Sequence, residues 1–329
     1  MKYLFNRIVA GTLVALSPVF VMAQTWIPTK AITYVVPVTS GSSNDLIARM
    51  LSEELPAKLG QPVIVDNRPD TSALVGAVSV ARSSPDGHTI VMVSSDVYMA
   101  PMLTPKAEGA NFDIIKDFSL IPTAGSAPML IVASQSINVK TPEERAAVLT
   151  KSGATSYGSP GTGSPMNIAS EMLKRYNGMQ IHHVPYRDVL SAVNALLADK
   201  LPISILALAG EAPHIATRKP RHEGLIEKQR SELISTMPTM TESGIAGVEP
   251  AVIFQILAPS TTPGADIQRP NTDINAVLAT SEFRDKLRGM GVQIEGGTSG
   301  DAAKLVRDTC APEQQVVKDL NIPVECTKS

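Results

Sequence analysis

Four short segments of this chain are rich in small polar residues and follow predicted strands. They are residues 39–44, 70–73, 94–96 and 158–164. The first follows the apolar run at 34–36 and precedes a segment with helical spacing. Its backbone N–H groups would therefore lie at a helix N-terminus, where an anion can bind. Each segment alone is typical of a solvated turn. Four of them together, all after strand ends, favour a cleft that binds a small anion.

Catalysis would require a nucleophile, a base and a group that orients the base, and the sequence contains no such set. Ser159 resembles a hydrolase nucleophile, but Tyr157 stands where the nucleophile elbow has a glycine. The glycines of 158–164 lack the spacing of a dinucleotide loop, and no lysine follows them to form a phosphate loop. His182 and His183 are adjacent, so on a strand they would point to opposite faces rather than share a metal. We expect neither an enzyme nor a cofactor or metal; a secreted hydrolase is the weaker alternative.

Strands that alternate with helices would position these loops. Residues 46–55 repeat at helical spacing behind Ser42 and Asp45, which form an N-terminal cap pair, and Gly60 ends that helix. Further strands are predicted at 62–65, 89–93, 129–132, 155–157 and 181–184, and further helices at 75–82, 167–176 and 189–198. This order predicts an α/β protein with parallel strands covered on both faces. In such sheets ligands bind at the carboxyl ends of the strands.

The first 23 residues have the pattern of a signal peptide. Lys2 and Arg7 flank the start of an apolar run that is too short to span a bilayer and that ends at Ala23. Cleavage after Ala23 would leave 306 of the 329 residues, with 27 basic and 31 acidic side chains and a net charge of −4. This balance gives no reason to expect nucleic acid as a partner. We expect export to the periplasm, and the remaining length suits two domains.

Two cysteines, Cys310 and Cys326, lie 16 residues apart near the C-terminus. In an oxidising compartment we favour a disulfide bond between them. Two free thiols are the alternative.

Several stretches of the chain resemble one family in their order and spacing. They include PTKAITYVVPVTSGSSNDLIARML, LGQPVIVDNRP, SSPDGHTIVMVSS, YGSPGTGSPMNIASEML and HVPYRDVLSAVNALLADKLPISI. No single stretch is decisive, but together they extend over nearly the whole mature chain. The chain resembles the periplasmic receptors of the tripartite tricarboxylate transporter family, also called Bordetella uptake gene receptors.

The resemblance implies a type II periplasmic binding protein fold, in which two α/β lobes close on a small carboxylate. The first lobe would comprise residues 24–128 and 253–329, the second residues 129–252, with crossing strands near 129–133 and 253–258. Such a receptor delivers its ligand to the membrane subunits of the transporter, and we expect it to be a monomer. A periplasmic receptor that passes its ligand-bound state to a signalling partner is the alternative, because it would use the same cleft.

In the family, main-chain amides and hydroxyls of one loop per lobe hold the carboxylate. The matching positions are Thr39, Ser40, Gly41, Ser42 and Asn44 in the first loop, Ser159, Gly161, Thr162, Gly163 and Ser164 in the second, and Ser94 and Ser95 in a third.

This chain also departs from the family pattern. Leu206 replaces an acidic residue common near the end of a second-lobe strand, and together with Phe254 it would give the site apolar surface. An α-amino group needs a carboxylate partner, so we expect a dicarboxylate, or an aromatic or aliphatic carboxylate, rather than an amino acid. Residues 70–73 replace a glycine-rich stretch, residues 218–233 are mostly charged where relatives have an apolar strand, and Pro270 should interrupt a helix. We expect the topology to survive with a weakened edge; whether these changes leave the receptor functional stays open.

Overall fold

The computed structural model describes residues 26–69, 73–99, 113–137, 144, 156–186, 189–209, 221–227, 229–245 and 251–320. The strands are β1 (Ile32–Val36), β2 (Val63–Asn67), β3 (Thr89–Ser94), β4 (Phe118–Ala133), β5 (Ser156–Ser159), β6 (His182–Pro185), β7 (Ile203–Ala207), β8 (Arg221–Leu225), β9 (Ala251–Pro259) and β10 (Gln293–Gly296). The α-helices are α1 (Ser43–Glu54), α2 (Pro56–Leu59), α3 (Leu74–Ala81), α5 (Ile114–Asp117), α7 (Pro165–Asn177), α8 (Val189–Leu197), α10 (Gly264–Leu278), α11 (Ser281–Gly289) and α12 (Ser299–Leu320), and the short 3₁₀ helices are η1 (Ser95–Tyr98) and η3 (Glu232–Ile234).

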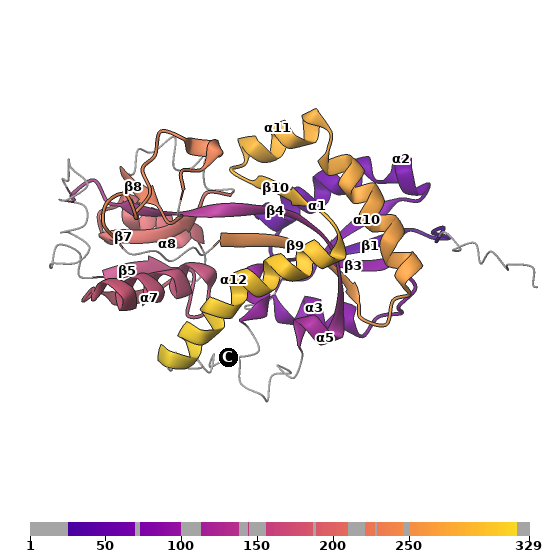
Figure 1. Ribbon diagram of the computed structural model, residues 1–329, viewed down its shortest axis with the longest axis horizontal. Helices are drawn as coiled ribbons and strands as arrows, with labels where there is room; N and C mark the ends of the chain where they lie inside the picture. The colour runs from indigo at the N-terminus through magenta and orange to yellow at the C-terminus, as the bar shows by residue number, and fades with distance from the viewer. Residues whose placement is uncertain are drawn as a thin grey trace, which may run out of the picture.

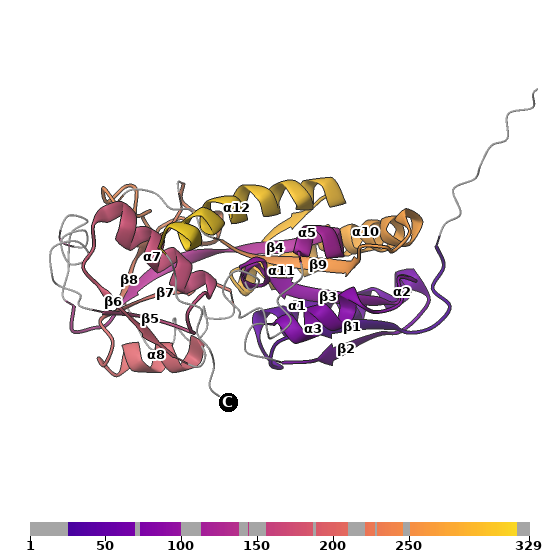
Figure 2. The same ribbon diagram turned by 90° about the horizontal axis from the view of Figure 1, so that it is seen from below.

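One long strand, β4, connects two groups of strands. Its residues 118–128 pair antiparallel with β9, which also pairs with β3, whereas its residues 129–133 pair with β7 and β8. The described strands follow the order β2-β1-β3-β9-β4-β7-β5-β6, with β8 and β10 also on β4. We call β1, β2, β3, β9, β10 and the start of β4 the first strand group, and β5 to β8 with the end of β4 the second. Figures 1 and 2 show these groups at opposite ends of the molecule.

The prediction of parallel strands is correct for part of each group. β1 pairs parallel with β2 and β3, and β5 pairs parallel with β6 and β7. It is wrong for the strand predicted at 129–132, which belongs to β4 and pairs antiparallel with β7, β8, β9 and β10 along its length. The shared strand β4 runs against both β9 and β7, so the complete sheet is mixed.

Helix α12 extends across both strand groups. It packs on β4 and β9 and reaches α7 of the second group, as the yellow helix in Figure 1 shows. Arg175 of α7 forms an ion pair at 2.9 Å with Asp319, which lies near the C-terminal end of α12. The C-terminal helix therefore contacts elements that belong to different strand groups.

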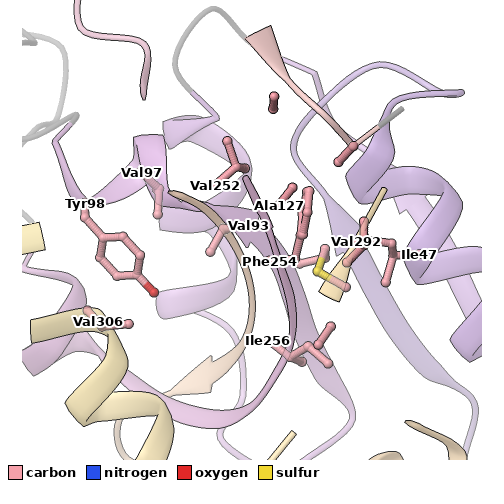
Figure 3. Packing of buried hydrophobic residues seen from close by; sticks show 14 of the residues in the cluster. Ile47, Val93, Val97, Tyr98, Ala127, Val252, Phe254, Ile256, Val292 and Val306 are labelled. Carbon is pink, nitrogen blue, oxygen red and sulfur yellow. The ribbon is translucent and has the colours of Figure 1, made fainter. Parts of the chain in front are cut away.

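The hydrophobic core is continuous from α1 to α12. Figure 3 shows Phe254 and Ile256 of β9 among buried side chains that include Val93 of β3, Val292 and Ile47 of α1. A second, smaller cluster lies between the second strand group and α8. It comprises Leu130, Val132, Val193, Leu196, Leu206, Leu208 and Leu225. This smaller cluster consists of leucine and valine side chains alone.

The predicted ends of the first helical segment are confirmed. The Ser42 hydroxyl accepts the backbone N–H of Asp45 at the start of α1, and Gly60 ends α2 in a left-handed conformation with φ of +72°. Pro56 begins α2 and thereby divides the segment into α1 and α2. A proline fits the first turn of the second helix because its missing N–H has no helical partner there.

Pro270 does not interrupt its helix, so that prediction is wrong. α10 is continuous from Gly264 to Leu278 with Pro270 buried inside it. Ile267, Ile274 and Val277 of the same helix are buried in the core, and this packing maintains the helix although the proline removes one helical hydrogen bond. The mostly charged segment 218–233 contains the strand β8, which pairs with β4.

Within the described ranges, no helix is both long and apolar enough to cross a membrane. The predicted signal peptide at residues 1–23 lies outside these ranges, as does Cys326. Cys310 lies on α12 and is buried. The disulfide bond therefore stays a prediction.

Candidate functional site

The first candidate loop connects β1 to α1 and is closed by its own carboxylate. Gly41 has a left-handed φ of +86°, and its N–H donates to Asp45 Oδ2 at 2.8 Å. The Ser40 hydroxyl donates to the same oxygen at 3.2 Å. The Ser42 N–H donates to the carbonyl of Thr39 at 3.3 Å. These bonds fix the turn that begins α1.

The second candidate loop connects β5 to α7 and repeats this arrangement. Gly163 has a φ of +82°, and its N–H donates to Asn167 Oδ1 at 2.9 Å. The Ser164 hydroxyl accepts the N–H of Asn167 at 3.2 Å, as Ser42 accepts that of Asp45. The Ser164 N–H donates to the carbonyl of Gly161 at 3.3 Å. Two loops of different sequence thus share one capped geometry.

This geometry changes which groups can face a ligand. The side chains of Ser40, Ser42 and Ser164, and the N–H groups of Gly41 and Gly163, form bonds inside the loops in this conformation. The first-turn N–H groups of Ser43, Asn44 and Met166 have no acceptor within their helices. A helix N-terminus carries about half a positive charge, so these groups suit an anion. In this conformation Ser40, Gly41, Ser42, Gly163 and Ser164 therefore fix the loop geometry, whereas the first-turn amides have no helical acceptor.

Asp45 is a buried acid at the first loop, with a side chain 1% exposed. Arg49 Nε donates to its Oδ2 at 2.9 Å, and Asn67 Nδ2 donates to its Oδ1 at 2.9 Å. Burial raises the pKa of Asp45, but the hydrogen bonds from Arg49, Gly41 and Asn67 outweigh burial and hold this pKa below its ordinary value. The carboxylate is therefore ionised, and Arg49 balances its charge.

Asn167 is connected to a neutral hydroxyl instead. Its Nδ2 donates to Tyr157 Oη at 2.7 Å, and Tyr157 in turn donates to Glu171 Oε1 at 2.7 Å. Lys174 pairs with Glu171 at 3.2 Å. Burial, followed by the Glu171 carboxylate, raises the pKa of Tyr157 far above its ordinary value, so the hydroxyl keeps its hydrogen. The second loop therefore contains no ionised group equivalent to Asp45.

The third candidate loop lies beside the first. Asn44 Nδ2 donates to Ser94 Oγ at 3.3 Å. The Ser95 hydroxyl donates to the carbonyl of Ala251 at 3.3 Å and accepts the N–H of Ile253 at 3.5 Å. Ser94 thus contacts the first loop, whereas Ser95 fixes the start of β9.

The start of α1 also contacts the second strand group. Ser43 Oγ donates to the carbonyl of Ala209, just after β7, at 3.0 Å. β7 is the parallel neighbour of β5, which leads into the second loop. A hydrogen bond from the start of α1 therefore connects the first loop to the end of β7. β7 lies beside β5, the strand that precedes the second loop.

Leu206 and Phe254, the predicted apolar surface of the site, belong to the core. Leu206 is 0% exposed in the cluster against α8, and Phe254 is 2% exposed in the main core. Both side chains are closed to solvent in this conformation. Their contact with a ligand stays a prediction.

The structure adds one residue that sequence reasoning missed. His183 of β6 lies with Nε2 2.7 Å from Ser159 Oγ, although the two residues are 24 positions apart. Only the parallel pairing of β5 with β6 brings them together, and no local sequence signal predicts that register. Within the part of the chain that the structure describes, no three His, Cys, Asp or Glu side chains gather as metal ligands.

Comparisons with known proteins agree with this architecture. R. palustris Rpa4515, solved with adipate, is 27% identical with a TM-score of 0.79 and covers 90% of this chain and 99% of that one. MatC from Rhodopseudomonas palustris, with bound malate, is 23% identical with a TM-score of 0.77 and covers 88% and 100%. The periplasmic binding protein BugD is 23% identical with a TM-score of 0.77 and covers 90% and 99%.

These similarities confirm the fold that the resemblance implied, a periplasmic binding protein of the α/β class. The family model described as the tripartite tricarboxylate transporter family receptor matches residues 47–322. That span begins within α1, just after the first loop, and includes the whole second loop. The chain therefore belongs to the solute-binding receptors of the tripartite tricarboxylate transporter family.

Proposed function

We propose that this receptor binds a small carboxylate between the first and second loops in the periplasm. Residues 24–128 and 253–329 would form one lobe and residues 129–252 the other. The receptor would then deliver its ligand to the membrane subunits of a tripartite tricarboxylate-type transporter. A monomer is sufficient for this role, since one chain supplies both loops.

The observation that carries this proposal is the matched geometry of the two loops. Each loop ends a parallel strand, turns through a left-handed glycine and starts a helix behind a capping serine. Each leaves first-turn N–H groups without a helical acceptor. A carboxylate has two oxygens with about four acceptor positions, so one group could accept from both helices.

The ligand class follows from the charges around the loops. The first loop already contains the ionised Asp45, balanced by Arg49. An ammonium group in a closed site would need a carboxylate of its own, and burial without one costs several kcal/mol. The adipate bound by R. palustris Rpa4515 and the malate bound by MatC are small dicarboxylates. We therefore propose a dicarboxylate, or an aromatic or aliphatic monocarboxylate, as the ligand.

Matched ligand pairs test this proposal. Adipate is compared with 2-aminoadipate, and malate with aspartate, because each pair isolates the amino group. A ligand at 100 times its Kd stabilises a protein by about 2.7 kcal/mol, which a thermal shift detects. Benzoate is tested beside them as an aromatic carboxylate. We expect at least one of these carboxylates to raise the melting temperature, and neither amino acid to do so. A larger shift from aspartate or 2-aminoadipate would contradict the ligand class. Absence of any shift, together with native mass spectra free of carboxylate, would contradict the function.

A further inference from the structure

His183 lies directly behind the second loop. Its ring stacks on Tyr157 of the neighbouring strand, with ring centroids 5.0 Å apart and an interplanar angle of 21°. Tyr157 and His183 are partners in the parallel register of β5 and β6. His182 precedes it on the same strand with its side chain exposed, and adjacent strand residues point to opposite faces. Of the two histidines, His183 therefore faces the loop.

The contacts around Ser159 favour one position for the imidazole hydrogen. Ser159 is 0% exposed, and its Oγ lies 2.7 Å from His183 Nε2. The same hydroxyl donates to the carbonyl of Gly161 at 3.0 Å and accepts the N–H of Gly161 at 3.3 Å. A serine hydroxyl has one hydrogen and two acceptor positions. All three contacts are satisfied together when His183 carries a hydrogen on Nε2 and donates it to Ser159.

This arrangement argues against Ser159 as a nucleophile. A catalytic serine gives its hydrogen to the histidine and exposes its oxygen to a substrate. With the hydrogen on Nε2 of His183, the Ser159 hydroxyl donates to Gly161 instead, and the serine is fully buried. The short distance between Ser159 and His183 is better explained if His183 holds the second loop in place.

The same ring also supports the other half of the second loop. Tyr157, on which His183 stacks, accepts a hydrogen bond from Asn167 at 2.7 Å. Asn167 in turn accepts the N–H of Gly163 at 2.9 Å. Gly161 and Gly163 have φ values of +120° and +82°. Glycine adopts positive φ values without steric cost, so the surrounding hydrogen bonds can select these two conformations.

We propose that His183 is a positioning residue for ligand binding. By donating to Ser159 and stacking on Tyr157, it fixes the turns at Gly161 and Gly163 and thereby the direction of the first N–H groups of α7. The part of this inference that concerns ligand affinity rests on the proposed function. The part that concerns loop geometry does not, so the two can be tested separately.

Three substitutions separate the hydrogen bond from the ring. His183→Phe keeps an aromatic ring against Tyr157 and removes the nitrogen that contacts Ser159. His183→Gln keeps an N–H donor and removes the stacked ring. His182→Phe is the matched control, because it makes the same change one residue earlier on the opposite face. Circular dichroism and thermal unfolding identify any variant that fails to fold.

Calorimetric titration with adipate and malate measures the effect on affinity. We expect His183→Phe to raise Kd about tenfold or more, the usual effect of one lost hydrogen bond in a buried network. His183→Gln keeps a donor but loses the stacked ring, so its Kd should lie between those of wild type and His183→Phe, and His182→Phe should bind as wild type does. Wild-type affinity in His183→Phe would overturn the proposal.

NMR of the ligand-free protein tests the loop geometry directly. At neutral pH the ¹⁵N spectrum of the imidazole should show a hydrogen on Nε2 of His183, and Ser159→Ala should shift that resonance. The Gly161 amide should exchange faster in His183→Phe than in His182→Phe. An Nε2 without hydrogen, or equal exchange in both variants, would overturn the proposal. These readouts need no ligand, so they test the loop geometry even if no carboxylate binds to wild type, and that result would count against the proposed function alone.

Discussion

Asp45 and Asn167 occupy equivalent positions in the two loops, and each accepts the N–H of a left-handed glycine. The distances are 2.8 Å from Gly41 to Asp45 and 2.9 Å from Gly163 to Asn167. The two positions differ in charge, since Asp45 is ionised and paired with Arg49 whereas Asn167 is neutral. The first loop therefore contains an anion of its own, and the second loop does not.

Substitution of Asp45 tests how much this internal anion stabilises the protein. Asp45→Asn removes charge-assisted hydrogen bonds from Arg49, Gly41 and Asn67, and should lower the free energy of unfolding at pH 7 by about 1.5–3 kcal/mol. The pKa of Asp45 is lowered in the folded state, so its contribution is present above pH about 4 and disappears as pH falls through the lowered pKa. Urea unfolding should show the two proteins converging in acid. A difference in unfolding free energy between wild type and Asp45→Asn that stays constant down to pH 2 would show that ionised Asp45 does not stabilise the fold. Asp285→Asn, at an exposed position, is the control.

Ser43→Pro tests whether a first-turn N–H binds the ligand. Proline is favoured at this helix position, and α7 already has Pro165 there, so the helix should form without the Ser43 N–H. If that N–H contacts a carboxylate, affinity should fall by about 1–3 kcal/mol. Ser43→Ala is the control, because it removes the bond from Oγ to Ala209 and keeps the N–H. Equal dissociation constants for the two variants in calorimetry would remove the Ser43 N–H from the site.

Gly161→Ala tests the backbone conformation of the second loop. A Cβ at Gly161 would meet no atom within 4 Å, and the same holds for Gly264 at the start of α10. Only Gly161 has a positive φ, at +120°. Gly161→Ala should therefore lower the free energy of unfolding by about 1–3 kcal/mol, whereas Gly264→Ala should be neutral or slightly stabilising. Urea unfolding gives both values, and equal effects would show that the loop relaxes without strain.

Glu313 should make stability fall as pH rises. It is 2% exposed on α12, its Oε1 has no hydrogen-bond partner among the described residues, and burial raises its pKa from 4.5 to about 8. The folded state therefore retains a proton that the unfolded state releases. Between pH 4.5 and about 8, wild type should lose about 1.4 kcal/mol per pH unit relative to Glu313→Gln.

Urea unfolding of wild type and Glu313→Gln at pH 5, 6, 7 and 8 measures this difference. Asp308→Asn, on the exposed face of the same helix, controls for loss of a negative charge on α12. Parallel pH profiles for wild type and Glu313→Gln would show that Glu313 ionises without cost in the folded protein.

The predicted disulfide bond requires a thiol count under denaturing conditions. Cys310 is 3% exposed, and burial, followed by the charge of Glu313, raises the pKa of its thiol, so it would react poorly in the folded protein whether or not it is bridged. Exported protein unfolded in guanidinium without reductant should show no reactive thiol, and two after reduction. A bridge that closes about 15 residues would stabilise the protein by about 3 kcal/mol. Two thiols before reduction would exclude it.

The local features of the fold were predictable from the sequence. Runs of β-branched residues predicted β1, β2 and β3, and the spacing behind Ser42 predicted α1. The full length of β4 was not predictable, because Pro122, Gly125 and Pro128 interrupt the local strand pattern in its first part. The continuity of α10 through Pro270 likewise depends on core packing, which propensity does not report.

The sequence predicted that the two candidate loops lie between a strand and a helix, but it did not predict their internal hydrogen bonds. Hydroxyl and glycine content identified both loops, yet the same residues can donate to a ligand or to their own loop. The choice depends on contacts distant in sequence, such as Asn67 with Asp45 and His183 with Ser159. One left-handed conformation was also hidden, since Ala73 has a φ of +57° where a glycine would be expected.

A crystal structure of the receptor with the carboxylate that gives the largest thermal shift tests the central claim most directly. The proposed function predicts one carboxylate group within hydrogen-bonding distance of first-turn N–H groups from both α1 and α7, with Asp45 still paired to Arg49. A carboxylate that contacts only one of the two loops, or that lies away from both helix N-termini, would contradict it.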